Sequence, residues 1–145
     1  GHTRVVELLL DHGAMVDAAT KDGITPFACA VYHNHLETTA LLVGRGAMVD
    51  ASESMRSAGL YAAAYANNID IVQMLLSLGL DINALFNAGE TALHAAVRRA
   101  STDVVEMLLR NGADAHARSK TGDTPLFMAA RHGDAETFAL LCASR

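Results

Sequence analysis

Apolar and small residues recur along this chain with a fixed period of 33 positions. The clearest marker is a periodic glycine, found at Gly13, Gly46, Gly79 and Gly112. Three of these open near-copies of one phrase, GAMVD at 13–17 and 46–50 and GADAH at 112–116. A period of this length is typical of a solenoid, in which each unit buries its apolar face only against its neighbours. The pattern therefore predicts an elongated array of equivalent units.

The period divides the chain into a partial unit at 1–19 and units at 20–52, 53–85, 86–118 and 119–145, of which the last is truncated. Apolar stripes at helical spacing predict first helices at roughly 25–33, 58–66, 91–99 and 124–132, and second helices at roughly 36–44, 69–77, 102–110 and 135–142. The periodic glycine fits the left-handed position that ends a helix. We expect an all-α solenoid of stacked helix–turn–helix units joined by short hairpin loops.

Turn and cap residues support these boundaries. Thr-Pro pairs at 25–26 and 124–125 combine an N-cap with a residue whose φ suits the first helical position. Asn68, Ser101 and Asp134 are expected to cap second helices. Dipeptides ending in glycine at 22–23, 88–89 and 121–122 predict hairpin turns. The unit 53–85 has MRSAG at 55–59 in place of the glycine turn, so we expect its hairpin to be the weakest.

Three phrases carry a resemblance to a known family: GITPF at 23–27, GETALHAA at 89–96 and GDTPL at 122–126 resemble the ankyrin repeat. The resemblance recurs in every unit, and both ends of the chain look cut, as in a fragment of a longer repeat protein. It implies a curved array whose concave side, formed by hairpin tips and first helices, usually binds other proteins. It also implies that His94, the motif histidine, bonds the hairpin backbone. Tyr61 replaces that histidine in the unit before.

Composition and charge limit the classes of partner and the location that we expect. The net charge is −5 and no basic tract occurs, so nucleic acid is not expected as a partner. No apolar run approaches the ~18 residues of a membrane span. Cys29 and Cys142 lie three units apart, about 24–30 Å if helices pack at ~8–10 Å, which is too far for a disulfide. We expect buried free thiols, a monomer, and an intracellular location, cytoplasmic or nuclear.

Candidate chemistry is sparse. Seven histidines are present, but His33 and His35 do not share a helix face and no CxxC or HExxH pattern exists, so no metal site is predicted. No serine or cysteine has a plausible histidine partner in its own unit. The glycines at 44 and 46 end a helix, where the dipole repels phosphate. The sequence therefore predicts no cofactor and no enzyme activity within these residues.

The candidate binding residues are those that the repeat pattern leaves free. They are Tyr32, His33, Met55, Tyr65, Arg98, Arg99, Arg131 and His132. Tyrosine and arginine are enriched at binding hot spots. Because the tyrosines precede the arginines along the array, we expect a partner polypeptide that is apolar near Tyr32, Tyr65 and Met55 and acidic near the arginines.

Asn83 is a possible hydroxylation site, because its spacing resembles the ankyrin sites of an asparaginyl hydroxylase. The competing interpretation is that Asn83 only hydrogen-bonds its turn.

The leading hypothesis for the whole chain is a protein-interaction scaffold or adaptor. One alternative is the targeting or regulatory region of a larger multidomain enzyme, such as a kinase, a ubiquitin-ligase adaptor or an effector. Another is that the chain belongs to a long array that acts only as a structural spacer.

Overall fold

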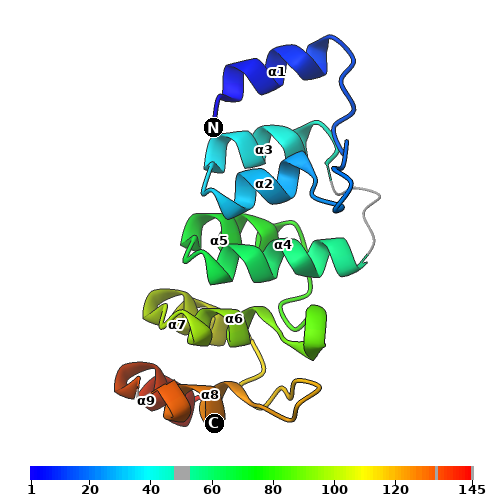
Figure 1. Ribbon diagram of the computed structural model, residues 1–145. Helices are drawn as coiled ribbons and strands as arrows, with labels where there is room; N and C mark the ends of the chain where they lie inside the picture. The colour runs from blue at the N-terminus through cyan, green and yellow to red at the C-terminus, as the bar shows by residue number, and fades with distance from the viewer. Residues whose placement is uncertain (48–52, 133, 145) are drawn as a thin grey trace.

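The computed structural model describes residues 1–47, 53–132 and 134–144, without the side chains of 53–55. Its helices stack in two layers along one axis (Figure 1). The first-helix layer contains α2 (Pro26–Tyr32), α4 (Glu53–Tyr65), α6 (Ala92–Arg98) and α8 (Pro125–His132). The second-helix layer contains α1 (Thr3–Asp11), α3 (Leu36–Gly44), α5 (Ile69–Ser77), α7 (Thr102–Arg110) and α9 (Ala135–Ala143).

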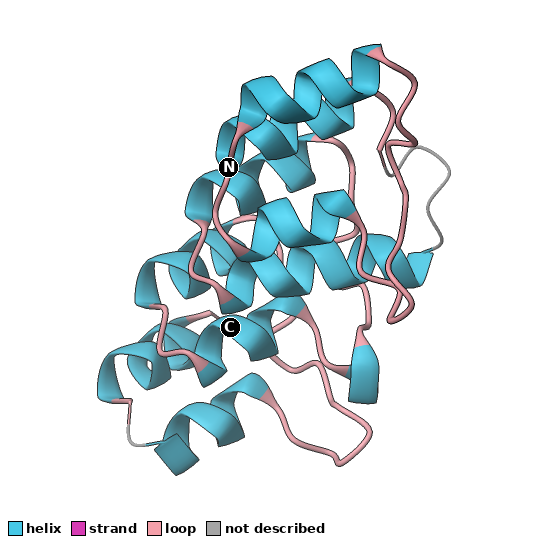
Figure 2. Cartoon of the chain, turned by 45° about the horizontal axis from the view of Figure 1, so that its top comes forward, coloured by secondary structure: helices cyan, strands magenta, loops and turns pink. Residues whose placement is uncertain are grey.

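Each helix packs mainly on its own partner and on its equivalents in neighbouring units. The contacts run α2 to α4 to α6 to α8 in one layer and α1 to α3 to α5 to α7 to α9 in the other. Figure 2 shows helices and loops, and no strand occurs among the described residues. The 3₁₀ turn η1 (Asn87–Gly89) lies in the hairpin before α6. The predicted all-α solenoid is confirmed.

The core is repeated from unit to unit. One alanine column and one leucine column are buried in all four units that contain both helices: Ala30, Ala63, Ala96, Ala129, Leu42, Leu75, Leu108 and Leu141. The small alanines sit on the first helices and the leucines on the second. Alanine allows close approach between adjacent units, and the leucine column buries one large apolar side chain in each unit.

Helix ends follow the sequence closely. Apart from α4, every observed boundary lies within one residue of the predicted one. The periodic glycines adopt φ between +81° and +93°, the left-handed geometry that closes a helix. Backbone N–H groups that follow the helix then donate to carbonyl oxygens of its last turn. Ala113 N, for example, donates to Leu108 O at 3.0 Å. The Thr25 side chain accepts from Ala28 N at 3.1 Å, as expected of an N-cap.

Helix α4 corrects one prediction. We expected a weak hairpin before a first helix at roughly 58–66, but α4 begins at Glu53. The residues at 53–58 are all compatible with a helix, and none of them is a glycine that could supply a positive φ. The helix therefore continues backwards through the hairpin position. Ser57, on the added turn, is buried.

Two of the three predicted caps are also wrong. The Asn68 amide donates to Val31 O at 3.0 Å instead, which ties α5 to the preceding unit. Ser101 makes no side-chain cap bond to α7. Only Asp134 caps its helix, by accepting from Thr137 N at 3.2 Å.

Both cysteines are exposed, which contradicts the expectation of buried thiols. The residues equivalent to Cys29 are less exposed in units that follow another first helix: Ala62 is half-buried, and Ala95 and Met128 are buried. No first helix precedes α2 among residues 1–25. Cys142 occupies a column that is only half-buried elsewhere, as at Leu76 and Leu109. Residue type suggested burial, but position in the stack decides it.

Candidate functional site

Seven of the eight predicted binding residues lie at the C-terminal ends of successive first helices, whereas Met55 lies near the start of α4. Tyr32, His33, Arg98, Arg99, Arg131 and His132 are exposed, and Tyr65 is half-buried. The side chain of Met55 lies outside the described residues. Because each first helix packs on the next, equivalent positions line up along the array. We call the surface formed by these seven described residues the first-helix face.

Two arginines of the first-helix face lie over aromatic rings. The Arg99 Cζ atom is 5.1 Å from the centroid of Tyr65, which belongs to the preceding unit. The Arg131 Cζ atom is 6.0 Å from the centroid of Phe127 in its own helix. Both distances fall within the range of cation–π attraction. Tyrosine and arginine that appeared separate in sequence thus form a composite surface.

Phe127 is a candidate that the sequence analysis missed. Its side chain is 53% exposed, although phenylalanine is normally a core residue. It occupies the column of Tyr61 and His94, in which the motif histidine normally stands. The sequence signal for Phe127 was an aromatic residue at a position where the repeat normally has an inter-unit histidine.

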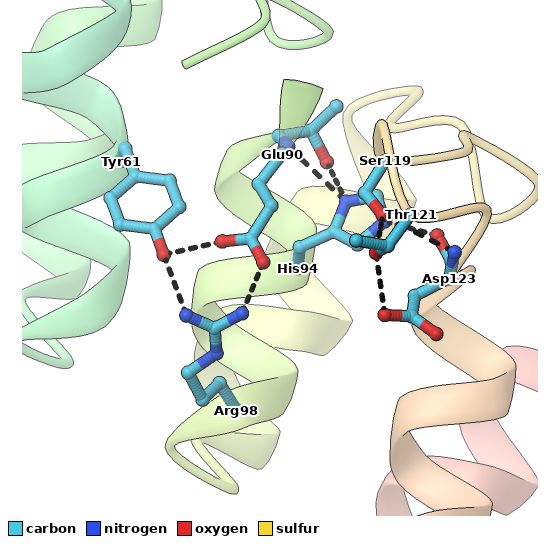
Figure 3. Close-up of polar contacts among 8 residues, drawn as sticks. Tyr61, Glu90, His94, Arg98, Ser119, Thr121 and Asp123 are labelled. Atoms are coloured by element: carbon cyan, nitrogen blue, oxygen red, sulfur yellow. Dashed lines mark hydrogen bonds and ion pairs between the residues drawn. The ribbon is translucent and has the colours of Figure 1, made fainter. Parts of the chain in front are cut away.

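Arg98 has a different environment from its neighbour Arg99. Its guanidinium forms an ion pair with Glu90, and its Nη1 donates to the Tyr61 hydroxyl oxygen at 3.4 Å (Figure 3). The Tyr61 hydroxyl donates in turn to Glu90 Oε2 at 2.7 Å. The Glu90 side chain is only 13% exposed. The network therefore joins α4 to the hairpin and helix of the next unit. Within it, the Arg98 guanidinium is already paired with the Glu90 carboxylate.

The Tyr61 hydroxyl is held in its protonated form. Burial and its hydrogen bond to the Glu90 carboxylate raise the pKa of Tyr61 to about 12. A phenolate beside the carboxylate would lose the bond and add repulsion. Tyr61 is consequently a hydrogen-bond donor across the neutral range.

His94 forms the equivalent joint one unit later. Its Nδ1 accepts from the Thr91 backbone N–H at 3.2 Å, and its Nε2 lies 3.1 Å from the Asp123 carbonyl oxygen. Since Nδ1 accepts, the proton belongs on Nε2, which donates to the carbonyl. His94 is fully buried. The hairpin bond that the resemblance implied is present, and both ring nitrogens are occupied.

Consecutive hairpins are joined directly as well. Lys120 N donates to Ala88 O at 2.7 Å, and Ser119, Thr121 and Asp123 bond one another within the second hairpin (Figure 3). Gly89 has φ +70° and passes so close that an added Cβ would lie 3.2 Å from Lys120 N. Glycine is favoured here both by its φ and because a Cβ would force the neighbouring hairpin to shift.

Asn83 bridges two inter-unit loops. Its Oδ1 accepts from Asp114 N at 2.8 Å, and its Nδ2 donates to Gly112 O at 3.4 Å. Its own backbone N–H donates to Asp81 Oδ1 at 2.9 Å. This geometry accounts for the asparagine by turn bonding alone, and hydroxylation of Asn83 stays a prediction.

Other sites have little support among the described residues. No group of three histidine, cysteine or acidic side chains there could hold a metal ion. A hollow of about 420 Å³ lies beside α4 and the end of α5, and its lining includes Arg56, Leu75 and Asp81. Within the same part of the chain, every helix is too short or too polar to span a bilayer.

Family comparisons agree with this geometry. A model of ankyrin repeats in three copies matches residues 60–145, and a model of ankyrin repeats in many copies matches residues 1–43. The chain belongs to the ankyrin-repeat family. Ankyrin repeats are generally protein–protein interaction modules and typically non-catalytic. No curated protein matches the chain.

The segment 44–59 lies in neither of these two matches. It includes the first part of α4, in which helix replaces the expected hairpin. The departure of this ankyrin unit is therefore visible in both its sequence and its structure.

Proposed function

We propose that this ankyrin array is a scaffold or adaptor module that binds a partner polypeptide along its first-helix face. The observation that carries the proposal is the contrast between adjacent columns of the first helices. The alanine column is buried throughout, whereas the columns at 32–33, 65–66, 98–99 and 131–132 present tyrosine, arginine and histidine outward. Residues of these types are enriched at binding hot spots.

The partner segment would be apolar or aromatic at one end and acidic at the other. Tyr32, which is 59% exposed, and half-buried Tyr65 support the apolar end. Arg99 and Arg131 support the acidic end. This order follows the stacking of the units, so an extended segment lying along the array would meet the tyrosines before the arginines.

Selection of peptides from a displayed random library on the intact chain tests the proposal. The affinity of a selected peptide is then measured by fluorescence anisotropy for the unaltered chain, Tyr65→Ala and Phe138→Ala. Phe138 is an exposed aromatic on α9, in the second-helix layer, and serves as the matched control. Tyr65→Ala should weaken binding by about thirtyfold, the loss of a ~2 kcal/mol hot spot, and Phe138→Ala should change it little.

The charged end has its own test. The double reversal Arg98→Glu with Arg131→Glu should weaken the same peptide by more than about twofold. Peptides that lose affinity with Phe138→Ala but not with Tyr65→Ala would place binding on the second-helix layer and overturn the proposal.

A further inference from the structure

The arginines of the first-helix face differ in whether a carboxylate already occupies them. Arg98 is paired with Glu90, as Arg45 is with Asp11 and Arg110 with Glu106. Among the described residues, no carboxylate lies within 4.0 Å of Arg99 or Arg131. Within the described part of the chain, these two exposed guanidinium groups therefore have no carboxylate counter-ion.

Each of these two guanidinium groups lies within cation–π distance of an aromatic ring. Arg99 lies over Tyr65, and Arg131 lies over Phe127. An aromatic ring restrains the plane of the guanidinium and leaves its N–H edges free to donate. Those edges match a carboxylate, which can accept two parallel hydrogen bonds from one arginine. The two sites therefore combine an apolar surface with an unused carboxylate-binding group.

We propose that Arg99 and Arg131 anchor two carboxylate side chains of an acidic partner peptide, and that Glu90 keeps Arg98 out of this contact. The inference rests on the proposed function and specifies which residues select the partner. Glu90 acts as an internal competitor, because its carboxylate holds the guanidinium that a partner carboxylate would need. The Tyr61 hydroxyl, which donates to Glu90, helps to hold that carboxylate in place.

A purely structural role is the competing explanation. All three arginines lie at the C-terminal ends of first helices, where a cation offsets the negative end of the helix dipole. In that case substitution would change the stability of the chain without changing its affinity for a peptide. Stability and affinity must therefore be measured on the same variants.

The experiment uses the intact chain and a displayed peptide library with positions open to acidic, neutral and basic residues. We expect selected peptides to be enriched in aspartate and glutamate. For a synthetic selected peptide, Arg99→Gln with Arg131→Gln should weaken binding by about fivefold or more, because the charged partners are lost. Arg98→Gln should change it by less than about twofold, and Glu90→Gln should strengthen it by about twofold, since Arg98 is released.

Arg110→Gln is the matched control. Arg110 is an exposed arginine on α7, in the second-helix layer, so its loss removes one positive charge away from the proposed anchors. It should leave the affinity unchanged. Thermal unfolding of every variant separates an effect on the fold from an effect on binding.

Three results would overturn the inference. One is a loss with Arg98→Gln as large as that with Arg99→Gln. Another is an unchanged affinity in the Arg99 and Arg131 double variant alongside lowered thermal stability. The third is selection of peptides without acidic enrichment that still depend on Tyr65, and this result would leave the proposed function standing. Failure to select any peptide would count against both.

Discussion

Two joints between neighbouring units use the same column of the repeat but different chemistry. In one, His94 donates from Nε2 to the Asp123 backbone carbonyl and is fully buried. In the other, Tyr61 donates to the Glu90 side chain and shares that carboxylate with Arg98, whose side chain is 41% exposed. Residue and acceptor are 29 positions apart in both cases.

The difference shows how a repeat can keep its geometry while it changes its surface. The histidine joint is satisfied by neutral groups, namely two backbone groups and the Thr91 hydroxyl, so it recruits no ionised side chain. The tyrosine joint needs an ionised side chain, and this carboxylate attracts the guanidinium of Arg98. Substitution at a structural position thereby changes which charged groups remain for a partner.

Of the substitutions that test the two joints, His94→Ala should have the largest effect. It removes a buried side chain and leaves the Thr91 N–H and the Asp123 carbonyl without their partner. We expect the free energy of unfolding to fall by about 3 kcal/mol, measured by urea denaturation followed by circular dichroism. His94→Gln, which retains a donor and an acceptor, should recover part of the loss. A loss below about 1 kcal/mol would mean that the histidine joint contributes no more than an ordinary exposed bond.

The hairpin contact beside His94 can be tested with a matched pair of glycines. Gly89→Ala places a residue at φ +70° and a Cβ 3.2 Å from Lys120 N, whereas Gly122→Ala meets only the unfavourable φ of +83°. We expect losses of about 2 and about 1 kcal/mol respectively, from the same denaturation measurement. Equal losses would show that the close approach of the two hairpins is readily relieved.

The tyrosine joint should respond more weakly. Tyr61→Phe removes the hydroxyl that donates to Glu90 and should cost about 1 kcal/mol, because water reaches this network. A double-mutant cycle with Arg98→Gln should give a coupling energy of about 0.5 kcal/mol or more. Additive effects of the two substitutions would mean that Tyr61 and Arg98 do not act together.

The smallest effect is spectroscopic. The chain has three tyrosines, and the raised pKa predicts that Tyr61 ionises near pH 12, later than an ordinary phenol near 10. A pKa raised in the folded state stabilises the fold fully below about pH 10, and this contribution is lost as the pH rises through about 12. Ultraviolet titration should show a late fraction that Tyr61→Phe removes. Persistence of the late fraction in that variant would contradict its assignment to Tyr61.

Most of the fold could be predicted from the sequence because solenoid contacts are local. The 33-residue period places equivalent residues in equivalent environments, so one apolar column read from the sequence fixes a layer of the core. The ends of the second helices were predicted almost to the residue because a left-handed φ is favoured just after a helix and the glycines at 46, 79 and 112 readily adopt it. The start of α4 was not predicted correctly. The 33-residue period implied a hairpin before residue 58, although this unit lacks the glycine turn that the other units have.

The candidate surface was only partly predictable. The repeat pattern identified Tyr32, Tyr65, Arg98, Arg99 and Arg131 as positions outside the core, but it treated neighbouring arginines alike. The position of Arg99 over Tyr65 depends on a contact across units, as does the bond from Tyr61 to the carboxylate that pairs with Arg98. Phe127 was overlooked because phenylalanine usually lies in the core.

The sequence by itself determined the repeat, the helix pairs and the buried columns, because periodic spacing and backbone conformation are encoded in short segments. Only the tertiary structure decided that the cysteines are exposed, that Asn68 bonds the preceding unit and that Arg98 is occupied while Arg99 is not. These properties depend on contacts between side chains of separate units. The stacking of the units sets the distances between those side chains, and their separation along the sequence does not.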